Sequence, residues 1–94
     1  MASAVDDNSV PSLAPTFRFQ WEEVQNCHVI LYPEGMVKLS SSAGEIMKRC
    51  DGCKTVREIV EELGRDFPGI DLRSDVIKFL EEACHHGWIR TRTA

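Results

Sequence analysis

The sequence predicts an α+β fold in which a three-stranded antiparallel sheet is followed by three helices. The first half of the chain carries short apolar runs separated by turn residues, as strands do. After residue 40, apolar residues recur every three or four positions, as they do on one face of a helix. Ninety-four residues are enough for one hydrophobic core but not for a deep cavity between two lobes.

Three strands are expected in the first half. In residues 17–21, aromatic side chains alternate with polar ones, which predicts a half-buried strand. In residues 27–32 apolar side chains occur at both odd and even positions, so both faces of a strand would be apolar. This pattern predicts the central strand. Residues 36–39 predict an edge strand, folded back on the central one by a Pro-Glu-Gly corner. In that corner Pro33 presets one backbone angle, and we expect Gly35 to supply a positive φ.

The first two helices are marked by their end signals. Serines at positions 40–42 are candidate N-caps for the first helix, and Gly52 ends it if it adopts the left-handed conformation. Thr55 and Glu58 form a capping box at the start of the second helix. A Pro-Gly pair at 68–69 stops that helix.

The third helix begins at a cap on Asp71 or Ser74 and ends at Gly87. Its apolar band covers more of the circumference than one neighbour needs. The residues that suffice for the core are Val76, Phe79, Leu80 and Ala83. Ile77 and Cys84 form a second ridge, with Leu80 at its border. Another element or a partner must cover this ridge.

Both chain ends look weakly structured. Residues 1–14 are small, polar and interrupted by proline, which predicts a disordered tail or linker ahead of a domain at 15–92. The pair Trp88-Ile89 predicts a short terminal strand or a packed extension. Beyond Arg90 we expect a loose tail.

Composition excludes several classes of function. The formal charge is −4 and the basic residues are scattered, which argues against binding nucleic acid. No apolar run approaches the roughly 18 residues of a membrane span. The N-terminus lacks the pattern of a secretory signal, so the expected compartment is the cytoplasm.

Candidate chemistry is sparse. Cys50 and Cys53 have the spacing of a metal or redox pair, and the run 84–86 (Cys-His-His) could complete a zinc site. We favour no metal and no cofactor, because Cys50 is a core position of the first helix and Gly52 its end. No nucleophile elbow or phosphate loop is present, so we do not expect an enzyme.

Two binding functions are left. Three helices followed by a β element resemble a DNA-binding winged helix-turn-helix, but Asp75, Glu81 and Glu82 on the third helix would repel phosphates. The open edge of the third strand, beside a helix with surplus apolar surface, favours a peptide that adds a strand to the sheet. A second copy of the chain could cover the same edge.

The motif Leu-Tyr-Pro-Glu-Gly at 31–35, followed by Cys-Asp-Gly at 50–52 and Gly-Trp at 87–88, resembles the PqqD family. The resemblance covers residues 15 to 92. It implies a winged-helix-like fold and a non-catalytic peptide chaperone of pyrroloquinoline quinone biosynthesis. Such proteins bind the precursor peptide PqqA and present it to the radical SAM enzyme PqqE, and some are fused to PqqC.

The resemblance also implies where the peptide lies, along the third strand and in a groove against the third helix. Carried over position by position, the backbone-pairing residues are Met36, Val37, Lys38 and Leu39. The corresponding groove residues are Arg73, Val76, Ile77, Leu80 and Cys84.

Overall fold

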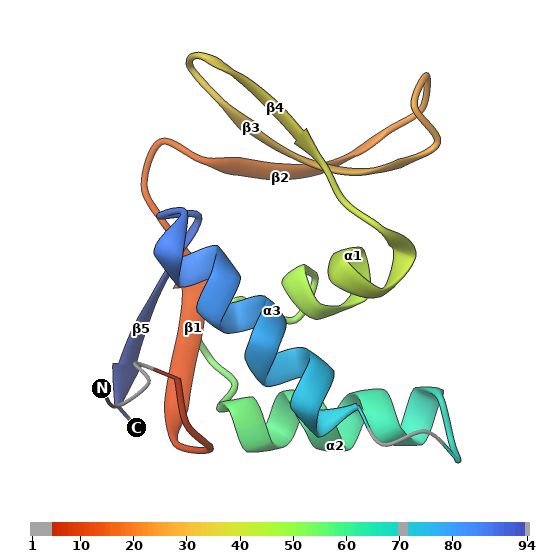
Figure 1. The fold of residues 1–94 in the computed structure, drawn as a ribbon, viewed down its shortest axis with the longest axis vertical. Coiled ribbons are helices and arrows are strands. Elements are labelled where there is room, and N and C mark those ends of the chain that lie inside the picture. The colour runs from red at the N-terminus through yellow and green to blue at the C-terminus, as the bar shows by residue number, and fades with distance from the viewer. Residues whose placement is uncertain (1–4, 70–71, 94) are drawn as a thin grey trace.

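A computed structural model describes residues 5–69 and 72–93 and has the predicted α+β fold (Figure 1). Two small antiparallel sheets pack on three helices. The strands are β1 (Ser9–Leu13), β2 (Arg18–Glu22), β3 (Cys27–Tyr32), β4 (Gly35–Lys38) and β5 (Ile89–Thr93). The helices are α1 (Ser41–Met47), α2 (Val56–Asp66) and α3 (Arg73–His85).

The larger sheet has the order β2-β3-β4, as the sequence predicted. Phe19, Ile30 and Val37 are cross-strand neighbours and pack on the hydrophobic core from one face of this sheet. The prediction of a positive φ at Gly35 is wrong, because Gly35 is not among the positive-φ residues. A side chain there would place Cβ 3.3 Å from the Tyr32 hydroxyl, which is a tight contact.

Local end signals fix most helix boundaries. Ser40 caps α1 by accepting from the Ala43 N–H, and the capping box at the start of α2 is present in full. However, α1 ends at Met47, before Gly52, and the positive φ of Gly52 serves the turn that follows.

The third helix ends as predicted, but it begins differently. Gly87 lies just after the helix with a φ of 78°, and the Trp88 N–H donates to the Ala83 carbonyl. This pattern satisfies the last carbonyls of a helix. At the start, Leu72 and not Ser74 is the N-cap, and Asp71 lies outside the described residues.

The prediction of a disordered tail is wrong for the described residues before 15. Residues 9–13 form β1, which pairs antiparallel with β5 along its whole length. Val5 and Val10 are 4% and 3% exposed. The expectation of a loose tail beyond Arg90 is wrong for the same reason, since β5 continues to Thr93.

The geometry of this pair explains why a proline is tolerated in β1. The Ala14 N–H donates to the Trp88 carbonyl, and Pro11 lies three positions earlier in the same register. Because the hydrogen-bonded positions of an antiparallel pair alternate, the nitrogen of Pro11 faces away from β5. The missing N–H therefore removes no bond to β5, and the Pro11 carbonyl accepts from Gly52.

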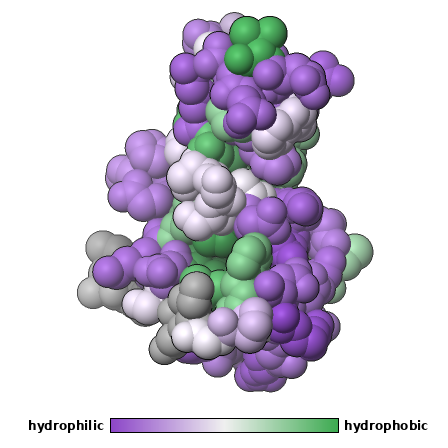
Figure 2. Space-filling model, turned by 90° about the vertical axis from the view of Figure 1, so that its right-hand side faces the viewer, coloured by the Kyte–Doolittle hydropathy of each residue, from purple (hydrophilic) through white to green (hydrophobic). Residues whose placement is uncertain are grey.

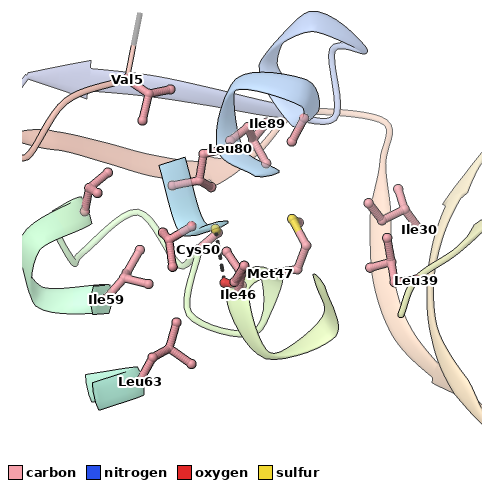
Figure 3. Packing of buried hydrophobic residues seen from close by; sticks show 13 residues of the cluster. Val5, Ile30, Leu39, Ile46, Met47, Cys50, Ile59, Leu63, Leu80 and Ile89 are labelled. Carbon is pink, nitrogen blue, oxygen red and sulfur yellow. Dashed lines mark hydrogen bonds between the residues drawn. The ribbon is translucent and has the colours of Figure 1, made fainter. Parts of the chain in front are cut away.

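The hydrophobic core lies between the helices and both sheets (Figure 3). Three residues of α3 have no exposed surface: Val76, Leu80 and Ala83. Leu80, Ile89 and Cys50 all belong to this cluster, and the Cys50 thiol donates to the Ile46 carbonyl. No helix in the described part of the chain combines the length and apolar character needed to cross a bilayer.

The buried position of Val10 gives a direct test of β1. We expect Val10→Ala to lower the free energy of unfolding by about 1–3 kcal/mol, because two buried methyl groups are lost and a cavity is left. Chemical denaturation measures the change. The matched control is Val24→Ala at the β2–β3 loop, where Val24 is 87% exposed and the loss should stay within about 0.5 kcal/mol. Equal losses for the two variants would show that β1 contributes no packing.

Candidate functional site

Strand β4 is the free edge of the larger sheet. In the described chain no strand pairs with its outer side, and Figure 1 shows β4 leading directly into α1. The β3–β4 register pairs Ile30 with Val37 and Val29 with Lys38. In continuation of that register, the Leu39 N–H donates to the His28 carbonyl at 3.0 Å.

This one bond determines which groups of β4 face outward. Hydrogen-bonded positions alternate along an antiparallel pair, so Val37 bonds to β3 together with Leu39. The N–H and C=O groups of Met36 and Lys38 then point away from β3. Of the four residues expected to pair with a peptide, Met36 and Lys38 can do so, and the prediction is wrong for Val37 and Leu39.

The five groove residues predicted on α3 do not form one exposed surface. Val76 and Leu80 are completely buried in the core, so the prediction of an open groove lined by Leu80 is wrong. Arg73, Ile77 and Cys84 share one flank of the helix by their spacing. Arg73 at the start of that flank forms an ion pair with Asp7.

The N-terminal segment is tied to the start of this ridge. The ion pair holds Asp7 against the start of α3, and the Arg57 N–H donates to the Asp7 carbonyl. Val5 is buried in the same core cluster, against which Ile77 and Cys84 pack. The sequence required a cover for this ridge but did not show that residues 5–13 belong to the packed domain.

The opposite flank of α3 lines an apolar pocket of about 500 Å³. Figure 2 shows apolar surface gathered in a hollow between the sheet above and the lower helices. The pocket lies at the junction of α1, the end of α2 and the start of α3. Its described lining is Ser40, Ser41, Ser42, Ala43, Glu45, Ile46, Leu63, Phe67, Leu72, Asp75, Val76 and Phe79. Of the predicted groove residues, only Val76 lines it.

The pocket adjoins the β4 edge. Ser40, two residues after the end of β4, is part of its lining. The floor consists of buried core residues such as Ile46, whereas Phe67 is 40% exposed at the mouth. Sequence patterns alone missed this flank, although the i, i+4, i+7 spacing of Leu72, Val76 and Phe79 could have marked it.

A buried arginine next to the pocket connects α1 to α2 through ion pairs. Arg49 is 9% exposed and donates to the Glu45 carboxylate at 2.9 Å and to the Glu62 carboxylate at 3.2 Å. It also forms an ion pair with Asp66. The hydrogen bond from Arg49 lowers the pKa of Glu45 below its ordinary value of 4.5, and the charges of Lys48 and Arg49 add to this effect.

Cys50 and Cys84 are not activated thiols. Burial raises the pKa of the Cys50 thiol to about 12, so it stays protonated at neutral pH. Burial also raises the pKa of Cys84. Among the residues that the structure describes, no three histidines, cysteines or carboxylates come close enough to hold a metal ion.

Comparisons with known proteins show what this chain is similar to. A family model described as coenzyme PQQ synthesis protein D (PqqD) matches residues 27–89. The PqqA binding protein of Azotobacter vinelandii is 51% identical over 83 residues, which cover 87% of this chain and 90% of that protein. The PqqA binding protein of Pseudomonas aeruginosa PAO1 is 54% identical over 85 residues, which cover 87% of this chain and 90% of that protein.

A solved structure matches over nearly the whole chain. It is the solution NMR structure of the PqqD truncation of Methylobacterium extorquens PqqCD, described as a stand-alone recognition element for ribosomally synthesized and post-translationally modified peptides. The TM-score is 0.79 and the identity 28%, and the match covers 94% of this chain and 96% of the other.

The ion pair between Glu45 and Arg49 predicts a pH-dependent stability. Because the folded pKa of Glu45 is lowered, its contribution is complete above pH 4.5 and is lost as the pH falls through the folded pKa. We expect Glu45→Gln to lower the free energy of unfolding by about 0.5–1 kcal/mol at pH 7.

Chemical denaturation of wild type and variant between pH 7 and pH 3 tests this. The difference between them should shrink as the pH falls below 4.5. The matched control is Glu61→Gln, an exposed carboxylate on α2, for which we expect no such trend. A difference for Glu45→Gln that stays constant with pH would contradict the prediction.

Proposed function

This chain belongs to the PqqD family and is not an enzyme, and on that premise we propose that it binds the precursor peptide PqqA by adding a peptide strand to β4. The observation that carries the proposal is the pair of outward-facing backbone positions, Met36 and Lys38, on an unpaired edge. The relatives named PqqA binding protein support the identity of the peptide.

Strand addition suits this edge for energetic reasons. An added strand forms backbone hydrogen bonds to the outward N–H and C=O groups, which supply affinity without regard to sequence. Side chains on one face of the added strand then lie beside Val37, on the side of the hydrophobic core. Side chains on the other face lie beside Met36 and Lys38, both of which are exposed.

We expect Lys38→Pro to weaken PqqA binding about 5- to 150-fold, which corresponds to about 1–3 kcal/mol for one lost backbone hydrogen bond. The Lys38 N–H is not bonded to β3, so proline at an edge position should leave the sheet intact. Titration of fluorescein-labelled PqqA, followed by fluorescence anisotropy, measures the affinity.

The matched control is Lys38→Ala, which removes the side chain but keeps the N–H, and it should bind PqqA nearly as tightly as wild type. Backbone amide spectra of Lys38→Pro report whether the fold persists. If the proline variant does not fold, PqqA methylated on single backbone nitrogens tests the same hydrogen bonds from the peptide side. Unchanged affinity of a folded proline variant would rule out strand pairing at this position.

We further propose that the chain presents bound PqqA to the radical SAM enzyme PqqE and acts in the cytoplasm. The family resemblance supports this role. The matched Methylobacterium extorquens structure is a truncation of PqqCD. That fusion supports association with PqqC as a second candidate contact.

If presentation and peptide binding use separate surfaces, Lys38→Pro should keep its affinity for PqqE while losing PqqA. We expect PqqE to co-elute with wild type and with the variant in size-exclusion chromatography, and PqqA to co-elute only with wild type. Loss of both partners in the folded variant would show that β4 also contacts PqqE. Failure of wild type to bind PqqE at all would refute presentation.

A further inference from the structure

Large apolar side chains are exposed at four places on the described chain: Trp21, Val24, Met36 and Phe67. Met36 lies on the β4 edge proposed for the peptide, and Phe67 lies at the mouth of the adjoining pocket. Trp21 and Val24 lie instead on the hairpin formed by β2, β3 and the loop between them. This β2–β3 hairpin is therefore an exposed apolar surface that a peptide on β4 leaves free.

We propose that the β2–β3 hairpin is the surface through which this chain docks on PqqE, with Trp21 as the apolar anchor and Glu22 and Glu23 as an acidic rim. This inference rests on the proposed presentation of PqqA, and it names the contact surface that presentation needs. The partner surface that fits the hairpin is an apolar cavity bordered by lysine or arginine side chains.

Trp21 has the properties of an interface anchor. Its side chain is 48% exposed, and its ring stands at 78° to the His28 ring, with 5.0 Å between the ring centroids. His28 is stacked on Phe19, and a Cβ on Gly44 would lie 2.7 Å from the His28 Nδ1, so α1 packs closely against this ring. These contacts hold the indole in place before binding, which lowers the conformational entropy lost on association.

The charge of the hairpin favours a basic partner surface. Between Phe19 and His28 the sequence contains two carboxylates, Glu22 and Glu23, and no lysine or arginine. Glu22 accepts from the Val24 N–H at 3.2 Å, which holds its carboxylate at the turn, and Glu23 is exposed. Lysine and arginine side chains are attracted to such a turn, whereas the same acidic hairpin of a second copy would be repelled.

The hairpin and the β4 edge can be occupied at the same time. Strands β2 and β4 lie on opposite sides of β3. The β2–β3 loop lies at the other end of the strands from the β3–β4 corner, and it projects away from α2 and α3 (Figure 1). A peptide strand on β4 therefore leaves Trp21 and Val24 uncovered, as a complex of three molecules requires.

A matched pair of charge reversals and one truncation form the test. Glu23→Lys reverses an exposed charge on the hairpin, and Glu61→Lys makes the same change at an exposed position of α2. Trp21→Ala removes the anchor. PqqE is titrated onto each immobilised full-length variant and onto wild type in biolayer interferometry. The affinity of the same preparations for fluorescein-labelled PqqA is measured by fluorescence anisotropy.

We expect Trp21→Ala to weaken PqqE binding about ten-fold or more, as the loss of a central aromatic side chain predicts. Glu23→Lys should weaken it about three-fold or more through repulsion from the basic surface, and Glu61→Lys should leave it unchanged. All three variants should bind PqqA as wild type does. If backbone amide spectra show that Trp21→Ala does not fold, Val24→Arg takes its place, because the Val24 side chain is 87% exposed.

The outcomes separate this inference from the proposed function. Unchanged PqqE affinity of folded Trp21→Ala and Glu23→Lys would overturn the hairpin as the docking surface, while PqqE binding by wild type would leave presentation standing. Equal weakening by Glu61→Lys would reveal an effect of net charge alone and would also overturn the inference. So would a Trp21→Ala variant that loses PqqA as well, because the hairpin would then belong to the peptide site.

A second copy of the chain is the competing occupant. If wild type is a dimer in sedimentation velocity and Trp21→Ala is a monomer with unchanged PqqE affinity, the hairpin binds that copy and the inference fails. Absence of any PqqE binding by wild type would refute presentation and this inference together.

Discussion

The complete burial of one stripe of α3 organises the rest of the structure. Val76, Leu80 and Ala83 have no exposed surface, and this stripe divides the helix into two flanks. The N-terminal segment and β5 pack on one side, with Asp7 paired to Arg73. The other flank meets α1 and the end of α2 around an open pocket. The same helix thus contributes to the core and forms one wall of the pocket.

Features that depend on near neighbours in the chain were predictable from the sequence. The capping box of Thr55 and Glu58, the helix end at Gly87 and the β3–β4 hairpin all involve residues within a few positions of one another. Their signals are local side-chain and backbone hydrogen bonds, which a sequence pattern carries. The family and the location of the free edge followed from the same hairpin.

Features that depend on distant residues were not predictable. The segment Ser9–Leu13 has little strand character of its own, and only its pairing with β5, some 80 residues later, makes it a strand. A proline inside it argued further against that assignment. Helical periodicity likewise identified two apolar ridges on α3, but it could not tell which one the chain itself covers. The groove was therefore assigned to the flank of Ile77, and the structure leaves the flank of Phe79 open instead.

The corner at Pro33 and Glu34 has a consequence for function that extends beyond the turn. It pairs Tyr32 with Gly35 and so fixes the register of β4 on β3. A slip of one residue would turn the Val37 side chain away from the core and bury that of Lys38, which is costly for a charged group. Core packing thus selects the register in which Lys38 and Met36 present their backbone groups outward. An exposed lysine on the edge also limits unspecific strand pairing, which protects the free edge from aggregation.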